Sequence, residues 1–116
     1  MDVTNPPDDG THYAADWAAQ ARLDHESVWH PCRVVLIARS GATVELGWTP
    51  DEEVLERVLH LRVREPASSD DALEVAGEIT KQRVPLRGPA QVRIRFVGPP
   101  LEPERLLELL LQLRSV

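Results

Sequence analysis

Residues 104–114, ERLLELLLQLR, have the spacing of an amphipathic α-helix with a broad leucine side, and residues 52–62, EEVLERVLHLR, repeat that spacing. Six of the eleven aligned positions are identical, and two more pair valine with leucine. A hairpin-like segment precedes each stretch, at residues 39–46 and 87–94. The similarity predicts two helices and a weak internal repeat of a hairpin–helix unit, although leucine-rich helices also resemble one another by chance.

Two further helices are predicted from one-sided patterns of apolar residues. Residues 13–27 gather tryptophan and several alanines on one side of a helix, and residues 70–81 follow two serines that can cap one. The helix of the second quoted stretch has a capping box at Thr49–Glu52. Its end stays open, because residues 59–64, LHLRVR, also alternate like a strand.

Four strands are predicted, at residues 33–38, 43–48, 84–86 and 91–97, from apolar runs and alternation bounded by turn residues. The predicted order is α-β-β-α-α-β-β-α. This order favours an α+β fold, a four-stranded antiparallel sheet from two hairpins packed with about four helices. The expected buried residues are Val35, Leu36, Ile37, Val44, Leu46, Ile94 and Phe96.

Length and composition predict one globular domain at residues 11–116, preceded by a flexible segment at residues 1–10 that contains three breakers of regular structure. No apolar run approaches the roughly 18 residues of a membrane span. The acidic, proline-containing start does not resemble a signal peptide. A single cysteine excludes an internal disulfide and fits a reducing compartment, so we expect a cytoplasmic protein.

The net charge of −6 is concentrated at the N-terminal end of the chain. Residues 1–31 carry one basic and six acidic side chains, a net of 1 − 6 = −5. Acidity overall disfavours nonspecific binding to nucleic acids or anionic membranes, but it permits a local basic patch.

The sequence offers little catalytic chemistry. It contains no phosphate-cradling glycine loop, no nucleophile elbow and no paired zinc histidines. His30-Pro31-Cys32 places a thiol near an imidazole, but its position before an apolar strand favours a small buried thiol over a nucleophile. A zinc site would need His12, His25, His30 and Cys32, whose spacing lacks paired ligands. We therefore predict no catalytic residue, no metal and no cofactor.

An arginine face is the first of two predicted partner-binding features. Arg83, Arg87, Arg93 and Arg95 alternate with apolar residues in the second hairpin, so four guanidinium groups would share one side of the sheet. Arginine binds carboxylates and phosphates bidentately, which indicates docking of an acidic partner. The alternative is a solvated face that Glu45 or the acidic N-terminal segment partly neutralises.

The last helix is the second feature. Its leucines cover an arc of about 200°, wider than the stripe of roughly 100° that one core contact needs. Leu107, Leu109 and Leu111 are therefore candidates for contacts outside the domain, and a twofold homodimer would cover them on both copies. Coverage by another element of the same chain is the alternative.

Three classes of function remain on these grounds. The first is a non-enzymatic acidic protein-interaction module, such as an adaptor, a secretion-type chaperone or an antitoxin- or immunity-like binder. The second, less favoured, is nucleic-acid or anion binding through the arginine face. The third is a small enzyme that uses Cys32 and a histidine.

Overall fold

The computed structural model describes residues 11–50, 53–64 and 71–113 of the 116-residue chain. Within these residues lie six strands and one helix. They are β1 (Tyr13–Leu23), β2 (His30–Ile37), β3 (Gly41–Leu46), β4 (Val58–Arg64), β5 (Asp71–Arg83), β6 (Gln91–Phe96) and α1 (Pro103–Gln112).

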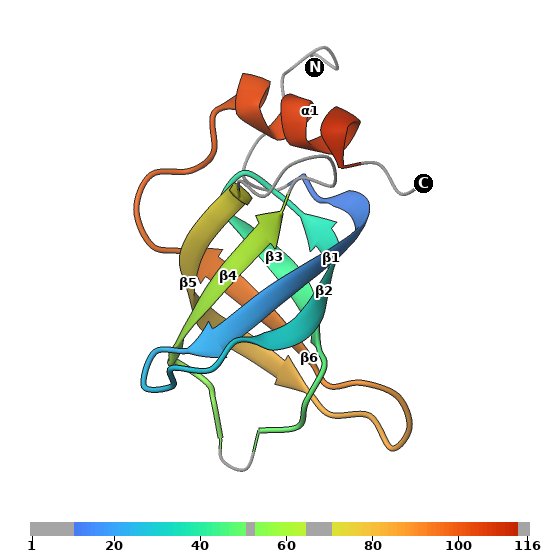
Figure 1. The fold of residues 1–116 in the computed structure, drawn as a ribbon, viewed down its shortest axis with the longest axis vertical. Helices are drawn as coiled ribbons and strands as arrows, with labels where there is room; N and C mark the ends of the chain where they lie inside the picture. Colours follow the sequence, from blue (N-terminus) through green and yellow to red (C-terminus); the bar gives the residue numbers. More distant parts are fainter. Residues whose placement is uncertain (1–10, 51–52, 65–70, 114–116) are drawn as a thin grey trace.

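The six strands form a closed antiparallel barrel in the order β1-β2-β3-β6-β5-β4 (Figure 1). The barrel closes where β1 pairs with β4, with Gln20 opposite Arg62 and Leu23 opposite Leu59. Closing a sheet on itself removes the unpaired strand edges at which proteins aggregate. Each strand is also hydrogen-bonded to a neighbour on both sides, so the barrel wall holds its outward side chains in fixed positions.

Alternation along the strands fills the barrel interior with aliphatic side chains. On β6, Val92, Ile94 and Phe96 are buried and alternate with the exposed Arg93 and Arg95. The other strands contribute Leu59, Leu61, Val63, Ile37, Val44 and Ile79 to the same core. Successive side chains of a strand point to opposite faces, so the core pattern fixes which residues face outward.

Helix α1 lies across one end of the barrel (Figure 1). It begins at Pro103, whose missing N–H leaves no donor unsatisfied at that position. Leu106 and Leu109 are fully buried in the core cluster. The helix predicted there is thus confirmed, and its leucines close this end of the core. In the described part of the chain, no helix is long and apolar enough to cross a membrane.

The predicted α+β fold, with four strands and about four helices, is wrong. The segments expected as helices at residues 13–27 and 70–81 are largely strands β1 and β5, and the segment at 59–64 belongs to β4. The predicted hairpin–helix repeat is wrong as well, because residues 53–62, the described part of its first copy, contain no helix. The strands expected at 33–38, 43–48 and 91–97 correspond to β2, β3 and β6. Residues 84–86, also expected as a strand, lie beyond the end of β5.

Alanine content and a bulge explain why β1 and β5 resemble helices in sequence. In β1 the inward residues keep a period of two, from Tyr13 and Trp17 to Ala21 and Leu23, although the β1–β2 register shifts between Ala14 and Trp17. Alanine also occupies outward positions of β1, so apolar residues do not alternate with polar ones, and the intrinsic propensity of alanine wrongly favours a helix. In β5 the register against β6 shifts between Ile79 and Lys81, and this bulge ends the alternation.

Most of the expected core residues are buried, but two are not. Ile37, Val44, Leu46, Ile94 and Phe96 are buried, whereas Val35 and Leu36 are only partly covered. The β2–β3 register shifts between Val34 and Leu36, so a bulge interrupts the inward alternation there. The continuous apolar run of β2 is therefore not buried on both faces. The expected flexible segment at residues 1–10 and Glu52 of the predicted capping box lie outside the described residues.

Candidate functional site

Strands β3, β6 and β5 form a continuous stretch of barrel wall with basic side chains on its outer face. Arg93 of β6 lies opposite Thr43 on one side and Lys81 on the other, and Gln91 lies opposite Glu45 and Arg83. Because Ile79 points into the core, regular alternation would also turn Lys81 inward. The bulge between these two residues instead turns Lys81 and Arg83 outward, beside Arg93.

These residues line a surface hollow of about 140 Å³, formed by Thr43, Lys81, Arg83, Gln91, Val92 and Arg93. We call Lys81, Arg83 and Arg93 the basic surface. All three are exposed, and within the described residues none of them forms an ion pair. On the same face, the carboxylate of Glu45 accepts a hydrogen bond from Gln91 Nε2 at 3.2 Å. The hollow therefore presents more positive than negative charge.

Thr43 lies at the base of this hollow. It points away from the core, since Ala42 and Val44 on either side of it belong to the core cluster. Its cross-strand neighbours Leu36 and Arg93 nevertheless leave only 8% of it exposed. Among the described residues, its hydroxyl is buried without a hydrogen-bond partner.

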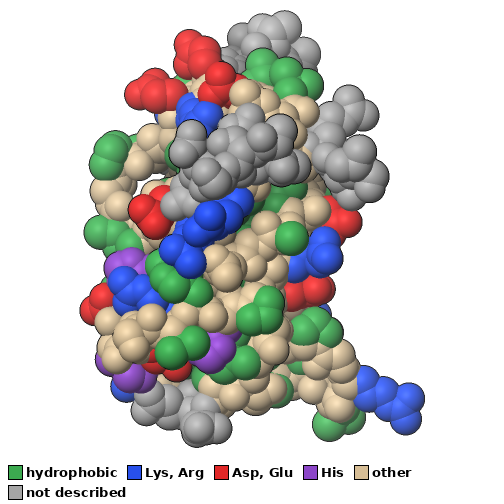
Figure 2. Space-filling view, viewed as in Figure 1, with side chains coloured by type: hydrophobic (Ala, Val, Ile, Leu, Met, Phe, Trp, Pro, Cys, Tyr) green, Lys and Arg blue, Asp and Glu red, His purple; other side chains and the backbone are tan. Residues whose placement is uncertain are grey.

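The structure separates the four predicted arginines. Arg83 and Arg93 line the hollow, whereas Arg95 forms an ion pair with Glu78 at 2.8 Å. Arg87 lies in the loop between β5 and β6, which projects from the barrel (Figure 1) and carries basic and hydrophobic side chains (Figure 2). Sequence reasoning missed Lys81, because it fell at the end of a predicted helix.

A second hollow lies on the other side of Arg93. Its volume is about 190 Å³, and it is lined by His12, Ser40, Gly41, Ala42, Thr80, Arg93, Ile94 and Arg95. Arg93 thus borders both hollows. Its exposed side chain has space on either side.

The three leucines predicted for an interface differ in exposure. Leu109 is fully buried in the core of its own barrel, whereas Leu107 is 55% and Leu111 61% exposed. Leu109 therefore has a structural role within the chain. Pairing of two copies through Leu107 and Leu111 stays a prediction.

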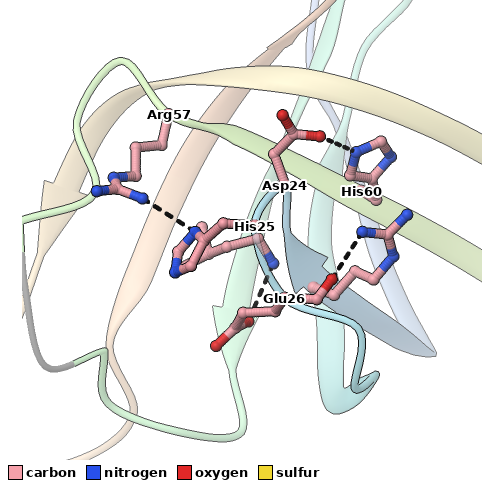
Figure 3. A network of polar contacts seen from close by, with 7 residues as sticks. Asp24, His25, Glu26, Arg57 and His60 are labelled. Carbon is pink, nitrogen blue, oxygen red and sulfur yellow. Dashed lines mark hydrogen bonds and ion pairs between the residues drawn. The ribbon is translucent and has the colours of Figure 1, made fainter.

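A network of polar contacts ties the β1–β2 loop to β4 (Figure 3). Asp24 Oδ1 lies 2.8 Å from His60 Nε2, and Arg57 Nη1 lies 2.9 Å from His25 Nδ1. The hydrogen bond from His60 holds the pKa of Asp24 below its usual value. Glu26 accepts a hydrogen bond from the Leu23 N–H. These contacts connect two barrel segments and require no ligand.

The residues considered for catalysis or metal binding do not converge. Burial raises the pKa of Cys32 to about 12, so its thiol is neutral near pH 7. His30 stacks on Trp48 with ring centroids 4.2 Å apart, and His25 contacts Arg57. In the described ranges, no three His, Cys, Asp or Glu side chains are close enough to hold a metal ion.

The other two tryptophans also have structural roles. Trp17 is buried in the core. The guanidinium carbon of Arg62 lies 4.0 Å from the ring centroid of Trp29, and that of Arg22 lies 5.2 Å from it. Such cation–π contacts hold Trp29 against the barrel wall.

Comparison with known proteins supports the fold. No protein-family model and no curated protein matches the chain. Among solved structures, the chain is similar to the Bacillus subtilis inhibitor of motility MotI/DgrA, with a TM-score of 0.58 and 14% sequence identity. The match covers 97% of this chain and 50% of that protein, so this chain spans about half its length. At this identity the similarity shows a shared fold alone.

Proposed function

We propose that this protein is a non-enzymatic protein-binding module whose basic surface binds an acidic segment of a partner protein. The observation that carries the proposal is the convergence of Lys81, Arg83 and Arg93 on one hollow of the barrel wall. Like charges on neighbouring strands repel one another, so folding alone does not favour this arrangement. A ligand with negative charge would relieve the repulsion.

Several observations favour a protein ligand. The net charge of −6 repels any anionic ligand at long range, and it repels a nucleic acid, which carries a charge at every phosphate, more strongly than a short acidic segment of a protein. The projecting loop next to the basic surface adds a fully exposed Leu86 to the cationic Arg87, and protein interfaces combine apolar with charged contacts in this way. A protein of the same fold is named for inhibiting motility, which agrees with a regulatory rather than a catalytic role.

The test is binding of a fluorescent hexaglutamate peptide, followed by anisotropy at low and at physiological salt. A charge-assisted contact contributes about 1.5–3 kcal/mol, so Arg93→Ala or Arg83→Ala should weaken binding about tenfold or more. Arg105→Ala is the matched control. It removes the same charge from α1, where Arg105 pairs with Glu108, and should change the affinity less than twofold.

Two results would refute the proposal. One is equal binding by the wild type and both basic-surface variants. The other is tighter binding of a single-stranded hexanucleotide than of hexaglutamate at the same salt concentration, which would favour the nucleic-acid class.

A further inference from the structure

The Thr43 hydroxyl is a hydrogen-bonding group without a role in the fold. Nearly all buried polar groups of folded proteins have a partner, so an unpartnered hydroxyl requires an explanation. Valine has almost the same shape, favours strands, and would fit a site that Leu36 and Arg93 cover. Threonine at this position therefore indicates a partner that the described part of the chain does not supply.

The surroundings of the hydroxyl indicate an anion. Lys81, Arg83 and Arg93 line the hollow above Thr43, and the amide of Gln91 is already engaged with Glu45. An oxygen of a bound anion would accept the hydroxyl proton while the cations neutralise its charge. The hollow of about 140 Å³ has room for a small acidic group.

Glu45 places a negative charge near that anion. It lies two residues from Thr43 on the same strand face, a distance of roughly 7 Å at strand spacing. Its carboxylate repels the anion while Lys81, Arg83 and Arg93 attract it, and both effects grow with the charge of the anion. The assignment of a carboxylate therefore comes from the proposed function, in which the partner segment is acidic through Glu and Asp side chains.

Access to the hydroxyl requires a movement of Arg93. This residue lies directly opposite Thr43, is exposed, and borders the second hollow of about 190 Å³. Because the hydroxyl is buried in the conformation described, an anion contacts it only after the Arg93 side chain moves toward that second hollow.

We propose that the hollow above Thr43 is a carboxylate-binding subsite, in which a Glu or Asp side chain of the partner accepts a hydrogen bond from Thr43 Oγ1. Arg93 and Lys81 neutralise the bound carboxylate, and Arg83 contacts the adjoining part of the acidic segment. This inference rests on the proposed function and specifies how one acidic side chain is recognised.

The experiment measures hexaglutamate affinity by titration calorimetry for the full chain and for Thr43→Val and Thr43→Ser. Thr43→Val removes only the hydroxyl and should weaken binding about tenfold. Thr43→Ser keeps the hydroxyl and should bind within twofold of the wild type. Thermal melting of each variant checks the fold, and Thr43→Ala replaces Thr43→Val if the latter does not fold.

The outcomes separate this inference from the proposed function. Unchanged affinity in Thr43→Val together with loss in Arg93→Ala would overturn the subsite and leave the acidic-partner proposal intact. Unchanged affinity in both variants would overturn both. Tighter binding of a phosphoserine peptide of equal charge, with that advantage lost in Thr43→Val, would overturn the carboxylate assignment.

Discussion

Lys81 and Arg93 lie directly opposite each other in the β5–β6 ladder, so two positive side chains are cross-strand neighbours on the outer face of the barrel. Like charges in this arrangement destabilise a sheet by a few tenths of a kcal/mol to about 1 kcal/mol. The proposed function accounts for such a pair, and the trade-off between stability and binding that it implies is testable.

Lys81→Glu is expected to stabilise the fold while impairing binding. The new carboxylate would lie opposite Arg93 and replace repulsion by attraction, which should raise the free energy of unfolding by about 0.2–1 kcal/mol. The same carboxylate should weaken hexaglutamate binding at least tenfold. Urea unfolding and anisotropy give the two values, and Lys81→Gln is the control for loss of charge alone. A variant that is less stable and binds normally would contradict this account.

The helix leucines should differ in their effect on stability. Leu109 is fully buried, so Leu109→Ala should lower the free energy of unfolding by about 2–5 kcal/mol. Leu111 is mostly exposed, and Leu111→Ala should cost less than about 0.5 kcal/mol. Urea unfolding compares the two. Sedimentation of the wild type and of Leu111→Glu tests the predicted homodimer. The prediction requires that the wild type sediment as a dimer and Leu111→Glu as a monomer, and equal masses of the two would contradict it.

The Asp24–His60 contact predicts a dependence of stability on acid. The hydrogen bond from His60 lowers the pKa of Asp24 in the folded state below the reference value of 3.8. Asp24 therefore contributes stability that is present above pH 3.8 and is lost as the pH falls through its lower folded pKa. Urea unfolding of the wild type and Asp24→Asn between pH 2 and 6 should show a stability difference that shrinks at the acid end. A difference that grows on acidification would contradict this assignment.

Cys32 should be unreactive in the folded protein. With a pKa of about 12, only about one thiol in ten thousand is ionised at pH 8. Iodoacetamide should therefore label native Cys32 at least a hundredfold more slowly than the urea-unfolded chain, in which the thiol pKa returns to about 8.5. Mass spectrometry follows the modification. Rapid labelling of the native protein would restore the thiol-enzyme hypothesis.

The sequence predicts those elements whose pattern has one period and a clear boundary. Residues 91–96 alternate without interruption, and α1 begins at a proline and carries leucines at helical spacing. In β1, Trp17 and Ala21 are four residues apart, a spacing that both a helix and a strand place on one face. In β5 the bulge interrupts the alternation. The neighbouring strand sets a register shift of this kind, and the local sequence pattern of one strand does not identify its neighbour.

The same limits apply to the candidate site. Arg83 and Arg93 follow from alternation in the second hairpin, but Lys81 joins them only because of the β5 bulge. Arg95 matches the arginine pattern, yet its pairing with Glu78 depends on the partner strand. For Thr43, the sequence indicates an outward position, whereas the burial of its hydroxyl depends on neighbours from two other strands.

The most direct test of the acidic-partner proposal is an amide NMR titration of the 116-residue chain with hexaglutamate. The account predicts that the largest shift changes fall on residues 43–45, 80–83 and 91–93, and that Arg93→Ala abolishes them at the same peptide concentration. Largest changes on α1 or on the β1–β2 loop, or unchanged shifts in Arg93→Ala, would contradict it.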